Sequence, residues 1–202
     1  MSASGFEAGS GSAAGGTPRS FGARLIGAFK LDASVFEEVE HDTSAFGQAL
    51  AVVALTALAQ AAGTFGETGS GGALASLVGG LVGWFLGTGL IWLIGVAIMN
   101  HTSDYGELLR TLGFAAAPGM LGVLGVLPLG PAESLLGLAI FALSTIAAVI
   151  AVRQALDVGT GRAIVVCVLA NLVPVAVGLA LGLLLAGTGA LEAPAAGGHI
   201  GF

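Results

Sequence analysis

Five long apolar blocks constrain this chain more than any other feature. They cover residues 44–64, 74–99, 109–129, 134–152 and 163–187. Each block approaches or exceeds the ~20 residues with which an α-helix crosses a bilayer. Because every backbone polar group in lipid needs a partner within the protein, such blocks form helices. The sequence therefore predicts an all-α, polytopic integral membrane protein with five transmembrane helices. Pro118 and several glycines interrupt the third block, so whether it crosses fully stays open.

The composition supports the same class of protein. Of the 202 residues, 55% are hydrophobic and only 9% are charged, whereas about a quarter of a soluble domain is charged. Lipid must therefore cover much of the surface. The formal net charge is −6 and Lys30 is the single lysine, so the chain has no basic patch with which to bind nucleic acid.

The few cations are distributed unevenly along the chain. With the amino terminus in the cytoplasm, five spans place all six on the cytoplasmic side: Arg19, Arg24, Lys30, Arg110, Arg153 and Arg162. Random placement would put six charges on one side only roughly once in thirty, and the positive-inside rule expects this arrangement. We therefore expect a multi-pass protein of the plasma (bacterial inner) membrane, with an extracytoplasmic carboxyl terminus.

The region before the first block divides into two parts. Residues 1–18 are rich in Gly, Ser and Ala and are predicted to be disordered. Residues 19–43 form a predicted amphipathic cytoplasmic segment of one or two short helices, in which Ser34 and Glu37 fit a capping box. The segment can lie on lipid or on its own domain. The transmembrane domain then covers residues 44–188, and residues 189–202 form a short tail.

Charged residues near this segment are candidates for docking a protein partner or lipid. An acidic run lies close to two cations, and two arginines flank the last cytoplasmic loop, where they could bind anionic lipid headgroups. The alternative interpretation of the run is a solvated helix face. The candidates are Arg24, Lys30, Glu37, Glu38, Glu40, Asp42, Arg153 and Arg162.

Three stretches of the sequence resemble the Yip family of polytopic membrane proteins, in its bacterial branch. They are "FGARLIGAFKLDASVFEEVEHDTSAFGQALAVV", "LLRTLGFAAAPGML" at 108–121 and "AVRQALDVGTGRAI" at 151–164. The resemblance covers about residues 20–187 and implies a multi-pass membrane protein. Eukaryotic members of the family are associated with Rab-type GTPases and vesicle traffic. Their Asp-Leu-Tyr-Gly-Pro motif is absent here, so the resemblance does not extend to Rab binding.

Small residues recur at helical spacing in two of the blocks. Gly79, Gly83 and Gly87 are four residues apart, and Gly178 and Gly182 form a similar stripe. Such stripes let helix backbones approach closely in membranes. We expect helix packing within the chain at these positions, with a homodimer interface as the alternative.

Polar residues inside the blocks are uncharged. Gln60 and Asn171 are the main candidates, and no block has a central ionisable residue, which argues against a proton-coupled transporter. Asn171 precedes Pro174, so this region is either a kinked helix or a polar vestibule.

The sequence offers little for catalysis or cofactor binding. His41, Asp42, His101 and Asp104 could meet and bind a divalent cation, but they lack the tight spacing of a metal motif. Asp42 and Asp104 also stand where they could cap helices. No catalytic residue and no cofactor is predicted.

These observations predict a non-enzymatic membrane scaffold or adaptor. It would engage a protein partner, a second copy of the chain or lipid through its cytoplasmic face. A small-solute channel or permease is the alternative, motivated by the glycine-rich second block, the prolines and Asn171. A membrane enzyme with a cation at His41 and His101 is a third possibility.

Overall fold

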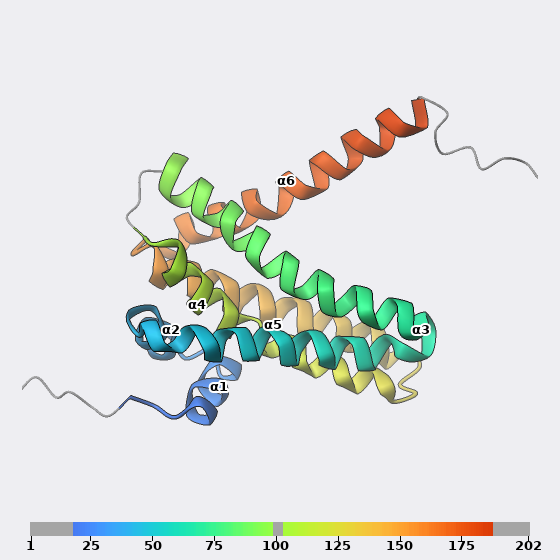
Figure 1. Cartoon of the computed structure of the whole chain (residues 1–202), viewed down its shortest axis with the longest axis horizontal. Helices are drawn as coiled ribbons and strands as arrows, with labels where there is room; N and C mark the ends of the chain where they lie inside the picture. Colours follow the sequence, from blue (N-terminus) through green and yellow to red (C-terminus); the bar gives the residue numbers. More distant parts are fainter. Residues whose placement is uncertain (1–17, 99–102, 188–202) are drawn as a thin grey trace, which may run out of the picture.

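The computed structural model describes residues 18–98 and 103–187, and the described chain is helical (Figure 1). The predicted disordered residues 1–17, His101 and the tail from residue 188 lie outside the described residues. The elements in order are α1 (Phe21–Phe29), α2 (Ala33–His41), the 3₁₀ turn η1 (Thr43–Ala45), α3 (Phe46–Trp92), the π-helical η2 (Leu93–Ile98), α4 (Tyr105–Ala115), the 3₁₀-helical η3 (Ala117–Val126), α5 (Ala132–Ala155) and α6 (Thr160–Gly187).

The amphipathic segment consists of two helices joined by a tight turn at Leu31, whose φ is 60°. The N-cap of α2 is Asp32, whose carboxylate accepts a hydrogen bond from the Ser34 backbone N–H at 3.0 Å. The predicted capping box on Ser34 is therefore wrong, because Ser34 already lies inside the helix. Aspartate competes well for this position since its carboxylate also favours the positive end of the helix dipole.

α3 contains two of the predicted spans in one assigned helix. Its 47 residues would extend ~70 Å if straight, more than twice the ~30 Å hydrocarbon core. Gly69 alone leaves helical geometry, with φ 62° and ψ −165°, a conformation open essentially to glycine. Figure 1 shows α3 folding back at its far end. The sequence predicts a loop at 65–73, and the structure instead has a one-residue hinge.

The two arms of α3, residues 46–68 and 70–92, lie side by side. The rings of Phe46 and Trp84 stack with centroids 6.0 Å apart. A Cβ built on Gly80 would lie 3.0 Å from that of Ala57. We refer to these segments as the first and second arms of α3.

Among residues 18–98 and 103–187, four helical stretches are long and apolar enough to cross a membrane: Thr43–Val96, Tyr105–Val126, Ala132–Ala155 and Thr160–Leu184. The first includes both arms of α3. The second combines α4 with η3, where Pro118 lies in the first turn of the 3₁₀ helix. Proline lacks the N–H and crowds the carbonyl four residues earlier, which explains why α4 ends at Ala115.

The buried core gathers at one end of the molecule. Phe36, Val39 and Phe114 are fully buried where α1 and α2 meet α3 and α4. A second cluster around Ile94, Leu156 and Val166 joins η2 to α5 and α6. Beyond it α6 runs outward from the other helices (Figure 1), and its leucines and valines are exposed.

The predicted packing stripes do not make the contacts expected of them. Apart from the adjacent residues and the local helix backbone, no described atom lies within 4 Å of a Cβ built on any of Gly79, Gly83, Gly87, Gly178 and Gly182. Close approach occurs at other glycines: Gly63 lies against the Gly122 carbonyl, and a Cβ on Gly113 would lie 2.7 Å from that of Ala49. These five glycines therefore make no such contact with the described residues. Gly80 rather than Gly79 meets the first arm, and Gly83 and Gly87 line a cavity beside it.

Candidate functional site

α1 and α2 form a unit, here called the helical cap (residues 21–41), that packs on the body of the chain. Val35, Phe36 and Val39 of α2 are fully buried. Phe21 of α1 meets Phe114 of α4 edge to face, with ring centroids 6.4 Å apart. The apolar face of the amphipathic segment is therefore covered by protein.

Arg24 joins the cap to the start of α3. Its Nη2 donates to Glu38 Oε1 at 2.8 Å and to Asp42 Oδ2 at 2.6 Å, and its Nη1 donates to Gln48 Oε1 at 3.0 Å. The side chain is 1% exposed. A buried guanidinium is stable only when its donors are matched in this way. Arg24 thus ties α1, α2 and α3 together.

The Arg24 network fixes the ionisation of its members. Burial opposes the charge on Arg24, but the hydrogen bonds that Arg24 donates to Asp42 and Glu38 outweigh it, so the Arg24 pKa is raised. Hydrogen bonds from Ser44 and then from Arg24 lower the pKa of Asp42. Because Arg24 is buried, it cannot contact a partner at the surface, and its prediction as a docking residue is corrected.

Arg110 of α4 holds the end of α2 from the other side. Its Nε donates to the Val39 carbonyl at 3.0 Å, and its Nη2 donates to the Glu40 carbonyl. These carbonyls belong to the last turn of α2, which lacks helical N–H partners and carries the negative end of the helix dipole. Arg110 is 7% exposed. It therefore stabilises the cap through the backbone of α2.

Glu40 is buried beside this contact, with 8% of its surface exposed. Burial raises the pKa of Glu40 to about 7, and the carboxylates of Asp157, Glu107 and Glu37 add to the effect while His41 opposes it. The group therefore titrates near neutral pH. Glu40 is also removed from the predicted docking surface, because its side chain is buried.

The outer face of the cap carries the remaining candidates. Lys30 and Glu37 are exposed, as is Ile26 at 57%. Glu38 and Asp42 are about one-quarter exposed but paired with Arg24. Arg162, in the first turn of α6, is exposed. Arg153, in the last turn of α5, is half-buried and donates to the Gln154 side chain at 3.0 Å.

The candidate metal ligands have other partners in the structure. Asp104 caps α4 in a capping box with Glu107, and Asp42 caps η1 through Ser44. The Nδ1 of His41 lies 2.9 Å from the Glu37 carbonyl, and this backbone contact is the main reason that the pKa of His41 is raised. His101 lies outside the described residues, among which no three His, Cys, Asp or Glu side chains converge on a metal position.

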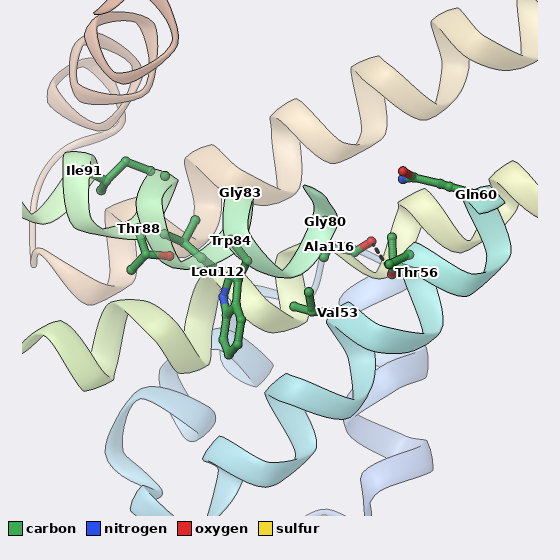
Figure 2. A pocket seen from close by; sticks show the side chains of 12 residues that line it. Val53, Thr56, Gln60, Gly80, Gly83, Trp84, Thr88, Ile91, Leu112 and Ala116 are labelled. Atoms are coloured by element: carbon green, nitrogen blue, oxygen red, sulfur yellow. Dashed lines mark hydrogen bonds between the residues drawn. The ribbon is translucent and has the colours of Figure 1, made fainter. Parts of the chain in front are cut away.

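The two intramembrane polar candidates lie in different surroundings. Gln60 lines a cavity of about 310 Å³ between the arms of α3 and α4 (Figure 2). Asn171 lines an apolar groove between α5 and α6, and its side chain donates to the Cys167 carbonyl at 2.8 Å. The structure therefore does not bring Gln60 and Asn171 together in one polar path.

Sequence reasoning missed the roles of Arg110 and Thr88. From the sequence, Arg110 is predicted only as a signal of membrane topology. In the structure it is buried, as are its neighbours Leu108 and Thr111. Thr88 has no distinguishing neighbour in the sequence. For Arg24 a signal was present, since Gly27 and Ala28 share its buried face at helical spacing.

The long apolar helices, the exposed apolar side chains and the charged end formed by the cap define a helical multi-pass membrane protein. The Yip1 domain model matches residues 28–184, so the chain belongs to the Yip1 family. This family consists generally of non-enzymatic membrane trafficking proteins. Neither the curated proteins nor the solved structures contain a significant match to the chain.

Proposed function

We propose that this chain is a non-enzymatic membrane scaffold or adaptor whose helical cap presents a docking face to a protein partner or lipid. The observation that carries the proposal is the division of the cap. Its inner face is held by Arg24 and Arg110, whereas Ile26, Lys30 and Glu37 face outward. A surface held rigid by its own protein loses little entropy when a partner binds.

The proposed topology has five crossings, with the cap in the cytoplasm of a bacterial inner membrane. It rests on counting each arm of α3 as one crossing, since the arms lie side by side around Gly69. The start of α4 and the end of α5 then lie at the cap, consistent with the contact of Arg110 with α2 and the proximity of Asp157 to Glu40. Cations gathered at one end agree with the positive-inside rule.

The test uses exposed charges that no internal network needs. A Lys30→Glu and Glu37→Lys double variant reverses two charges on the outer face and leaves the net charge unchanged. Glu133→Lys, an exposed charge in the first turn of α5, is the control. Complexes are purified in mild detergent from native membranes. We expect the double variant alone to lose a partner that the wild type retains; retention by both variants would contradict docking at the cap.

A small-solute permease is the second candidate, favoured by the cavity that contains Gln60, Thr56 and Thr88. If the cavity is part of a path, liposomes containing the protein should swell faster in iso-osmotic glycerol or urea than empty liposomes. Thr88→Leu should reduce that rate. Equal swelling with and without protein would remove this candidate and leave the scaffold.

A further inference from the structure

We propose that the cavity enclosed by α4 and the two arms of α3 is a binding site for a neutral, mainly apolar molecule that carries one hydroxyl or carbonyl group. The cavity has a volume of about 310 Å³. Figure 2 shows its side chains, which come from both arms and from the α4–η3 segment. The site is independent of the docking face on the cap.

The unpaired hydroxyl of Thr88 is the observation that indicates a ligand. Threonine in a helix commonly donates to the carbonyl four residues earlier, as Thr64 does to Gln60 at 3.1 Å and Thr145 does to Phe141 at 2.8 Å. Thr88 is 2% exposed, lines the cavity, and its Oγ1 has no hydrogen-bond partner in the part of the chain that the structure describes. A buried hydroxyl without a partner is unfavourable, and a ligand with an acceptor oxygen would satisfy it.

The other walls define the chemistry of that ligand. Val53, Trp84, Ile91 and Leu112 provide apolar surface. The twelve described residues that line the cavity include no charged side chain, so an ion would lose its hydration without compensation. The ligand is therefore neutral.

Two further polar groups line the other end of the cavity from Thr88 (Figure 2). The Thr56 hydroxyl already donates to the Ala116 carbonyl at 3.0 Å, which leaves its oxygen able only to accept. The side-chain amide of Gln60 lies on the same wall and can both donate and accept.

The volume of the cavity limits the size of the ligand, and the position of its mouth determines how the ligand enters. A cavity of about 150 Å³ holds benzene, and a water molecule takes about 30 Å³, so this cavity suits a molecule of about ten non-hydrogen atoms. Gly80, Gly83 and Gln60 are exposed, so the mouth opens on the apolar surface of the bundle. Beyond the adjacent residues and the local helix backbone, no described atom lies within 4 Å of a Cβ on Gly83 or Gly87. These glycines leave the mouth open.

Trp84 lies in the cavity wall and provides a fluorescent reporter. In the Trp92→Phe variant Trp84 is the only tryptophan, since the chain has two. The probe is 8-bromo-1-octanol, a neutral alcohol whose bromine quenches indole fluorescence. We expect saturable quenching in detergent. Thr88→Val should weaken the affinity about three- to tenfold, the effect of one hydrogen bond, and Thr88→Ser should restore it.

A matched pair of glycine variants tests the position of the site. Gly83→Leu places a side chain in the mouth and should abolish saturable quenching. Gly79→Leu, one turn away and outside the cavity, should leave it unchanged, because both positions have free space for a side chain. Quenching that rises linearly with probe concentration, or that is the same in the Gly83→Leu and Gly79→Leu variants, would overturn the proposal.

Discussion

The α4–η3 segment and α6 have similar lengths, but the first is largely buried inside the protein and the second is largely exposed. Half of the apolar window in Tyr105–Val126 is buried inside the chain, compared with 12% in Thr160–Leu184. α4 contributes Leu108, Arg110 and Phe114 to the interior, whereas Leu179, Leu183 and Leu184 of α6 are more than 60% exposed. Hydropathy alone therefore does not tell a core helix from a helix that faces lipid.

The difference follows from what each helix carries besides apolar side chains. α4 has a glycine at its closest contact with α3, an arginine for the α2 carbonyls and a capping box at its start. The outer part of α6 has none of these contacts among the described residues. Such a helix can face lipid without unpaired polar groups, because its backbone hydrogen bonds are all made within the helix. We therefore expect the stability of the chain to depend mainly on the cap and α4.

The largest expected effect is the loss of the Arg24 network. Arg24→Met leaves Glu38 and Asp42 without their cation and should lower the free energy of unfolding by about 3 kcal/mol, at the lower end for a broken buried pair because both acids are partly hydrated. Denaturant unfolding in detergent, followed by circular dichroism, measures it. Lys30→Met, which removes an exposed cation of the same cap, should change stability by less than about 0.5 kcal/mol. Equal effects would show that burial of Arg24 contributes nothing.

The next effect depends on pH. Because the pKa of Glu40 is raised to about 7, the folded chain binds a proton more tightly than the unfolded chain, and stability should fall as pH rises from about 4.5 to about 7. Glu40→Gln should remove this loss and be more stable than the wild type by about 2 kcal/mol at pH 8, with no difference below pH 4.5. Unfolding at a series of pH values measures it. The control is Glu133→Gln, an exposed glutamate that is not among the carboxylates acting on Glu40. A wild-type curve that is flat across this range would contradict the assignment.

A smaller effect separates the contacting glycines from the open ones. Gly113→Ala inserts a methyl group against Ala49 and should cost about 1.5 kcal/mol through overpacking. Gly79→Ala meets no described atom beyond its own turn of helix and should be neutral or slightly stabilising, since alanine has the higher helix propensity. Thermal unfolding of the two variants compares them directly, and the reverse order would contradict the packing described here.

The smallest effect concerns α6. Val177 is 60% exposed, so Val177→Ala should change the unfolding free energy by less than about 0.5 kcal/mol in detergent. A loss of 1 kcal/mol or more would mean that another surface covers α6 in the solubilised protein. Size-exclusion chromatography with light scattering on the same sample would then determine whether that surface is a second copy.

Much of this fold could be predicted from the apolar pattern, and what could not depends on single residues. α5 and α6 lie within a few residues of the predicted blocks 134–152 and 163–187. The loop expected at 65–73 was wrong because the helix continues through Thr64 and Thr68 and breaks only at Gly69. A run of Gly, Ser and Thr has the same composition in a loop and in a helix broken at one glycine, so the sequence alone does not distinguish the two.

The sequence singled out the charged residues around the cap but not the contacts that they make. The sequence shows Arg24, Glu38 and Asp42 within one charged segment, and in the structure the three side chains form ion pairs. It did not show that they face inward, because that depends on how α1 crosses α2. The contact of Arg110 with the α2 carbonyls joins residues 70 and 71 positions apart, and no local pattern records it.

Amide hydrogen exchange of the full chain in lipid nanodiscs tests the central claim most directly, namely that the cap is part of the folded body. Amides of α2 from Val39 to His41 should exchange at rates within about tenfold of those in the core of α4, and Arg110→Met should accelerate α2 more than the outer part of α6. Exchange of α2 at the rate of an unstructured peptide, with α4 still protected, would contradict the account.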